Sequence, residues 1–137
     1  MAVVNEIIRA EADGTLSFGN YIVTEKQKLN DFKFGGHIYK VKTSNELTRF
    51  ERDDKMLLET VPGTAIHNFK LVGENVEFFA EGNGNTQFTV GLEPETEYNI
   101  VICGELAGTS NSGISSKINF GAELDANTPC EIKIEKA

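Results

Sequence analysis

Residues 114–124, ISSKINFGAEL, decide the fold class of this chain because their apolar and polar side chains alternate. One face carries an apolar set that only Ser116 interrupts: Ile114, Ile118, Phe120, Ala122 and Leu124. A period of two over this stretch is typical of a strand with one buried and one hydrated face, as in antiparallel sheets. Cys130, Ile132 and Ile134 repeat the alternation near the C-terminus, so Cys130 is predicted to be a core side chain.

Short β-rich runs bounded by Gly, Asn, Asp or Pro recur along the rest of the chain, which is typical of an all-β sandwich or barrel. Gly35-Gly36 predicts a hairpin, because both glycines can take positive φ without strain. Gly82–Asn85 is interpreted as a tight hairpin loop and Ala107–Gly113 as a polar loop. The predicted strands are Val3–Glu11, Thr15–Val23, Leu29–Phe34, His37–Thr43, Thr64–Val72, Val76–Ala80, Gln87–Leu92, Glu97–Glu105, Ile114–Leu124 and Cys130–Glu135.

Residues 43–61 fit two secondary structures. A capping-box spacing that begins at Thr43 and a rough apolar stripe fit a helix. The same residues fit two strands, Glu46–Arg52 and Met56–Val61. Asp54 would lie on the apolar stripe of the helix, so we favour a hairpin.

Residues 91–104, GLEPETEYNIVICG, carry a regular pattern at alternate positions: Leu92, Pro94, Thr96 and Tyr98. The stretch resembles the end of strand E and the start of strand F in fibronectin type III domains. That resemblance implies a tyrosine corner, in which the Tyr98 hydroxyl bonds to backbone just upstream while the ring packs in the core. The chain has no Trp, and a further strand follows the last one that the resemblance covers. We therefore expect an antiparallel immunoglobulin-like β-sandwich over residues 62–137, preceded by an N-terminal region of β-hairpins over residues 1–61.

The chain as a whole, with GTLSFGNYIV at residues 14–23 and the turn at residues 60–63, is similar to short uncharacterised proteins of anaerobic Gram-positive bacteria. Some of these are labelled endosialidase. Sialidase chemistry needs a cationic clamp of about three arginines, and the chain has only Arg9, Arg49 and Arg52. It also lacks Asp-box repeats and is far too short for a propeller. We therefore do not expect sialidase activity.

The composition excludes several partners. With 137 residues the chain is about one domain long, and its net charge of −8 argues against nucleic acid or anionic membrane as a partner. Its first residues lack the basic and apolar regions of a signal peptide, so we expect a cytoplasmic protein. In a reducing compartment, Cys103 and Cys130 would both be free.

No arrangement of residues predicts catalysis, a cofactor or a metal site. His37 and His67 have no partner at metal-ligand spacing, and we expect them to be structural or surface residues. Carboxylate pairs occur among the 21 acidic residues, but charged turns explain them.

The candidate interaction residues fall into three groups. The polar loops offer Asn83, Asn85, Ser110 and Asn111, and two tyrosines, Tyr21 and Tyr39, keep a sugar-stacking hypothesis open. Val101 and Cys103 should point away from the core-facing side chain of Tyr98, towards a covering segment or a second subunit. We therefore expect a non-catalytic protein that acts through protein–protein contacts and self-associates as a homo-oligomer; the alternative is a carbohydrate-binding or carbohydrate-processing accessory protein.

Overall fold

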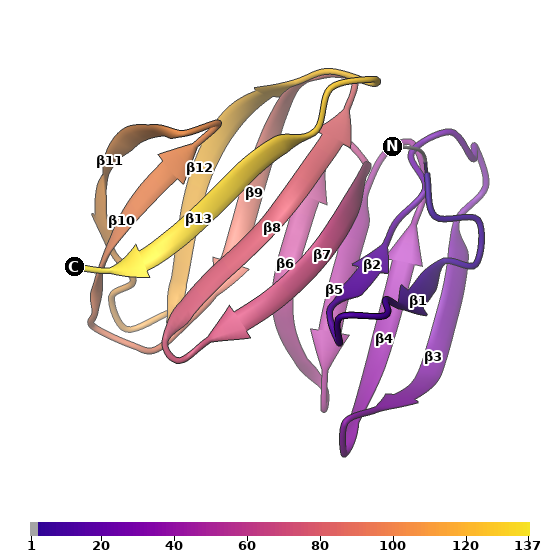
Figure 1. Ribbon diagram of the computed structural model, residues 1–137, viewed down its shortest axis with the longest axis horizontal. Coiled ribbons are helices and arrows are strands. Elements are labelled where there is room, and N and C mark those ends of the chain that lie inside the picture. The colour runs from indigo at the N-terminus through magenta and orange to yellow at the C-terminus, as the bar shows by residue number, and fades with distance from the viewer. Residues whose placement is uncertain (1–2) are drawn as a thin grey trace.

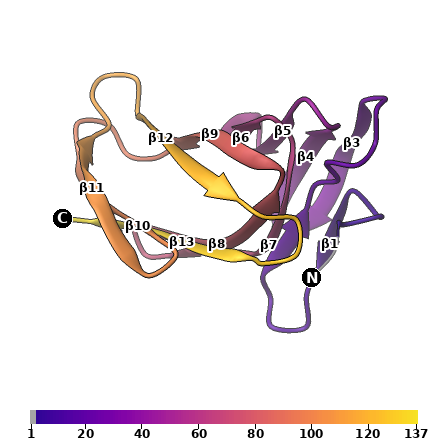
Figure 2. The same ribbon diagram turned by 90° about the horizontal axis from the view of Figure 1, so that it is seen from above.

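The computed structural model describes residues 3–137, and it is an all-β sandwich of two antiparallel sheets (Figure 1). The seven-stranded sheet contains, in spatial order, β1 (Ile8–Ala10), β2 (Leu16–Phe18), β7 (Thr64–Val72), β8 (Asn75–Gly82), β13 (Cys130–Lys136), β10 (Glu97–Ile102) and β11 (Glu105–Asn111). The six-stranded sheet contains β12 (Lys117–Leu124), β9 (Gly84–Gly91), β6 (Lys55–Val61), β5 (Thr48–Arg52), β4 (His37–Thr43) and β3 (Gln27–Phe34). Figure 2 shows the two sheets as layers, seen from above.

The predicted N-terminal hairpins are confirmed. Strands β3, β4, β5 and β6 follow one another in space as they do in sequence, and residues 43–61 form strands rather than a helix. Both sheets also contain strands from either side of Pro62, because β2, which pairs with β1 on one side, pairs with β7 on the other, while β9 pairs with β6.

Aromatic and aliphatic side chains from both sheets fill the space between the layers. Ring contacts run without a break from Tyr39 in one direction to Phe120 in the other, through Phe50, Phe18, Phe69, Phe78 and Phe88. The rings of Phe18 and Phe50 stack with centroids 4.1 Å apart, and both are fully buried. The alternation predicted near the C-terminus holds, since Cys130, Ile132 and Ile134 are buried.

Several strand boundaries differ from the prediction. Strand β12 begins at Lys117, and Ile114 is 90% exposed, because Gly113 and Ser116 take positive φ and form a turn. The first two strands are shorter than predicted, since the chain turns at Ile7 and Gly19, which also have positive φ.

Two connections were predicted wrongly. The loop at Gly82–Asn85 does not close a hairpin, because β8 and β9 lie in different sheets and the chain crosses between them there. Residues Ala107–Gly113 do not form a polar loop, since most of them belong to β11, whose partner is β10.

The predicted tyrosine corner is present. Tyr98 is fully buried, and the Glu93 backbone N–H donates a hydrogen bond to its hydroxyl oxygen at 3.2 Å.

Changing Tyr98→Phe should lower the free energy of unfolding by about 1 kcal/mol, because the Glu93 N–H loses its partner in a partly buried place. Chemical denaturation measures the loss. The matched control is Tyr39→Phe, because Tyr39 is also buried but its hydroxyl makes no hydrogen bond within residues 3–137. Equal stabilities for both variants would contradict the corner.

Candidate functional site

The β10–β11 hairpin forms one end of the seven-stranded sheet. Its turn is Cys103-Gly104, and both residues have positive φ, at 51° and 84°. That combination suits the tight two-residue turns of β-hairpins. Within residues 3–137, strand β11 is hydrogen-bonded to β10 alone, so its other side is an open edge of the described structure (Figure 1).

Strand β11 is the least protected of the four sheet edges. Natural proteins blunt edges with charge, proline or very short strands. Edge strand β1 has only three residues, while the edge strands β3 and β12 both carry charged side chains. Strand β11 runs for seven residues, ELAGTSN, with Glu105 as its only charge. Its backbone is therefore available for pairing with another strand.

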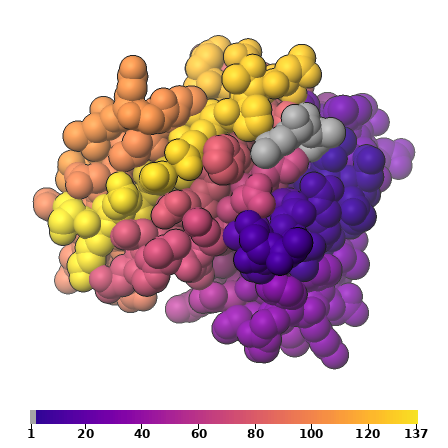
Figure 3. Space-filling model, viewed as in Figure 1, coloured from indigo at the N-terminus to yellow at the C-terminus, as the bar shows by residue number. Residues whose placement is uncertain are grey.

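Exposed apolar side chains flank this edge. Leu106 is 67% exposed on β11, and Ile114 is 90% exposed in the turn that follows. Leu106 is the register partner of Val101, which is half-buried on β10. We call β11 together with Val101, Leu106 and Ile114 the β11 surface; in Figure 3 the β11 segment forms part of the orange rim of the molecule.

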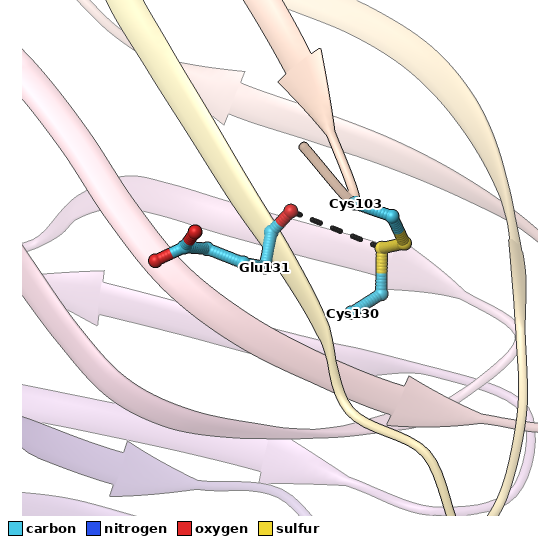
Figure 4. Close-up of a disulfide and its surroundings, with 3 residues drawn as sticks. All are labelled: Cys103, Cys130 and Glu131. Atoms are coloured by element: carbon cyan, nitrogen blue, oxygen red, sulfur yellow. Dashed lines mark hydrogen bonds between the residues drawn. A yellow bond between two sulfur atoms is a disulfide. The ribbon is translucent and has the colours of Figure 1, made fainter. Parts of the chain in front are cut away.

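A disulfide ties this hairpin to the rest of the sheet. Cys103 in the turn bonds to Cys130 at the start of β13, with the two Cα atoms 5.0 Å apart (Figure 4). The Cys103 N–H also donates a hydrogen bond to the Glu131 carbonyl at 2.8 Å. The prediction of two free cysteines is therefore wrong.

Cys103 lies in the hairpin turn rather than on the strand, and it is exposed. Strand alternation ends at Ile102, and the left-handed backbone at Cys103 lets its sulfur reach Cys130, which belongs to the buried core cluster. Val101 remains on the strand, opposite the exposed Leu106.

The other predicted interaction residues are scattered. Ser110 and Asn111 lie on β11 itself. Asn83 lines an open, polar depression of about 540 Å³ together with residues 124–128, whereas Asn85 is exposed on β9 outside that depression. Tyr21 and Tyr39 are only 7% and 9% exposed, so their rings offer no open face on which a sugar could stack.

A buried polar pair lies on the outer side of β7 and β8. The imidazole Nε2 of His67 lies 2.9 Å from Glu81 Oε1, and the two side chains are 4% and 0% exposed. Within the described residues, Glu81 Oε2 has no hydrogen-bond partner. Tyr21 is close by: its burial, together with the Glu81 carboxylate, raises the pKa of its phenol. On the same side, a hydrogen bond from Ser17 lowers the pKa of Glu11, aided by the nearby Arg9.

The three arginines are not gathered into a clamp. Arg9 pairs with Glu6 and Glu11, and Arg49 is engaged by Glu51 and Glu59. His37 lies 2.6 Å from Asp53, where a backbone hydrogen bond from Ile38 and the histidine together lower the pKa of the carboxyl group. Within residues 3–137, no group of three or more His, Cys, Asp or Glu side chains is arranged to hold a metal ion.

Sequence reasoning missed Leu106 and Ile114. The only signal for Leu106 was one large apolar residue in an otherwise small and polar run, and Ile114 was assigned to the buried face of the following strand.

Comparisons with protein-family models, with curated proteins and with solved structures found no match. Residues 3–137 contain no helix with the length and hydrophobicity that a membrane span requires.

Proposed function

We propose that this protein is a non-catalytic β-sandwich that self-associates through the β11 surface. The observation that carries the proposal is the combination of an open, nearly uncharged edge with two of the most exposed large apolar side chains of the described residues, Leu106 and Ile114. Apolar groups gathered at an open edge are typical of a place where another strand binds.

A second copy of the chain suits this edge. Two β11 strands that pair antiparallel about a two-fold axis at Gly108 place Leu106 of each copy opposite Ser110 of the other. The two Glu105 side chains then lie at opposite ends of the new ladder, away from one another. Such an interface is self-complementary, as two-fold dimers require.

The overall charge sets the salt dependence of the dimer. Each copy carries a net charge of −8, so the two copies repel at long range. Added salt screens that repulsion and leaves backbone pairing and apolar burial largely intact. We therefore expect the dimer to tighten as the ionic strength rises.

The test is the molar mass in solution over a wide concentration range, by sedimentation velocity or light scattering. The Leu106→Lys variant should weaken the dimer by about tenfold or more, because a charged side chain on an edge strand opposes pairing with another strand. The matched control is Ile22→Lys, since Ile22 is also 67% exposed but lies outside the β11 surface. A wild-type protein that stays monomeric up to millimolar concentration, or two variants with equal effects, would refute the proposal.

We also propose that the likeness to immunoglobulin and fibronectin type III domains is confined to the segment around the tyrosine corner. The Tyr98 hydroxyl bond supports the local likeness, as does the crossing of the chain from β9 in one sheet to β10 in the other. Carbohydrate binding gains no comparable support, because Tyr21 and Tyr39 are buried.

A further inference from the structure

A groove of about 580 Å³ opens at one end of the sandwich, between the two sheets. Figure 1 shows the β5–β6 and β7–β8 turns at this end. The volume is in the range of sites that hold small molecules. The groove meets the β11 surface only near the turn at residues 113–116, two of whose residues line it.

Apolar side chains from three segments line the inside of the groove. They are Met56 and Leu57 from β6, Leu71 and Val76 from the β7–β8 hairpin, and Leu92 and Pro94 from the loop that follows β9. Leu71 is 42% exposed, so part of this apolar lining faces solvent.

Cations gather on the wall formed by the six-stranded sheet. Arg52, Lys55 and Lys117 line the groove, and none of them has a carboxylate within ion-pair distance in residues 3–137. Arg52 and Lys55 are direct register partners across the β5–β6 hairpin. Like charges directly opposite one another destabilise a strand pair, and the neighbouring Asp53 carboxylate, whose pKa Arg52 helps to lower, offsets only part of that cost.

The carboxylates of the groove do not cancel these charges. Glu74 is held by Lys136, whose ammonium lies 2.8 Å away. Glu93, the other acidic residue of the lining, supplies one negative charge against the three cations without an ion-pair partner in residues 3–137. The groove therefore keeps an excess of positive charge in a protein whose net charge is −8.

We propose that this groove binds an organic anion with an apolar body, such as a medium-chain carboxylate or an aryl sulfonate. The anionic head lies between Arg52 and Lys55, and the hydrocarbon part packs against Met56, Leu71 and Leu92. Arg52 supplies the planar donors that match an oxyanion, while Lys55 adds a second charge.

Two dyes that differ only in their anionic group test the proposal. Anilinonaphthalenesulfonate should bind at one saturable site, measured by fluorescence. N-phenylnaphthylamine, which lacks the sulfonate, should bind about tenfold more weakly. Added salt should weaken binding of the sulfonate dye and leave the neutral dye unchanged. Amide chemical shifts of Gly73 and Gly91, which line the groove, should move on titration with decanoate.

Double variants test whether Arg52 and Lys55 bind the anionic group. Changing Arg52→Gln together with Lys55→Gln should weaken binding of the sulfonate dye by about tenfold and leave binding of the neutral dye unchanged. The control, Lys28→Gln together with Lys33→Gln, removes the same charge from exposed positions on β3 and should change the affinity for neither dye. Equal affinity for both dyes, equal effects of both double variants, or the absence of saturable binding would overturn the proposal. Far-ultraviolet circular dichroism checks independently that both double variants fold.

Discussion

Replacing Glu81 with alanine is expected to lower the free energy of unfolding by about 3 kcal/mol. The substitution leaves the His67 imidazole, 4% exposed, without the carboxylate that lies 2.9 Å from it. It also opens a cavity in a closely packed place, which adds to the loss. Chemical denaturation followed by far-ultraviolet circular dichroism measures the change. Few single substitutions on the surface of this sandwich should have a comparable effect.

Glu77→Ala is the matched control for this loss. Glu77 lies on the same strand and the same face, but its side chain is 24% exposed and reaches Lys70 only at 3.9 Å. A partly exposed ion pair of this kind contributes about 1 kcal/mol or less. Glu81→Gln should lose less than Glu81→Ala, since the amide keeps the shape and can still bond to His67. Equal stabilities for Glu81→Ala and Glu77→Ala would show that the His67–Glu81 pair is not buried as described.

Alternation of apolar and polar residues made most of the fold predictable. Strands that bury one face, such as β4 and β13, repeat that pattern, and their positions follow from the sequence. Tyr98 was predictable as well, because the corner is a local motif whose partner, Glu93, lies only five residues away.

Strand β11 could not be predicted in the same way. Its side chains bury little, so its sequence is not constrained to alternate. Backbone pairing with β10 makes it a strand. The segment of Gly, Thr, Ser and Asn therefore indicated a loop. The groove cations were not predicted for a related reason, since Arg52 and Lys117 line one groove only because β12, β9, β6 and β5 lie in that order in the sheet. Features that depend on which strands are neighbours leave almost no trace in a single sequence.

The Cys103–Cys130 bond is expected to contribute about 3.5 kcal/mol to the free energy of unfolding. The bond closes a loop with a sequence separation of 27 residues, and a cross-link of that length restricts the unfolded chain by about this amount. The measurement compares denaturation of the wild-type protein with and without a reductant, so the sequence is the same in both samples. The variant with Cys103→Ser and Cys130→Ala should resemble the reduced protein and should not respond to the reductant.

Reduction should act mainly on the β10–β11 hairpin. The disulfide joins the hairpin turn to β13, so amide hydrogen exchange should quicken along β11 before it does so in the six-stranded sheet. A looser β11 is also a poorer partner for a second copy, because more order must be gained on pairing. The reduced protein should therefore dimerise more weakly than the oxidised protein. If native wild-type protein reacted with two equivalents of a thiol reagent in the absence of reductant, both expectations would fail, because the two cysteines would then be free.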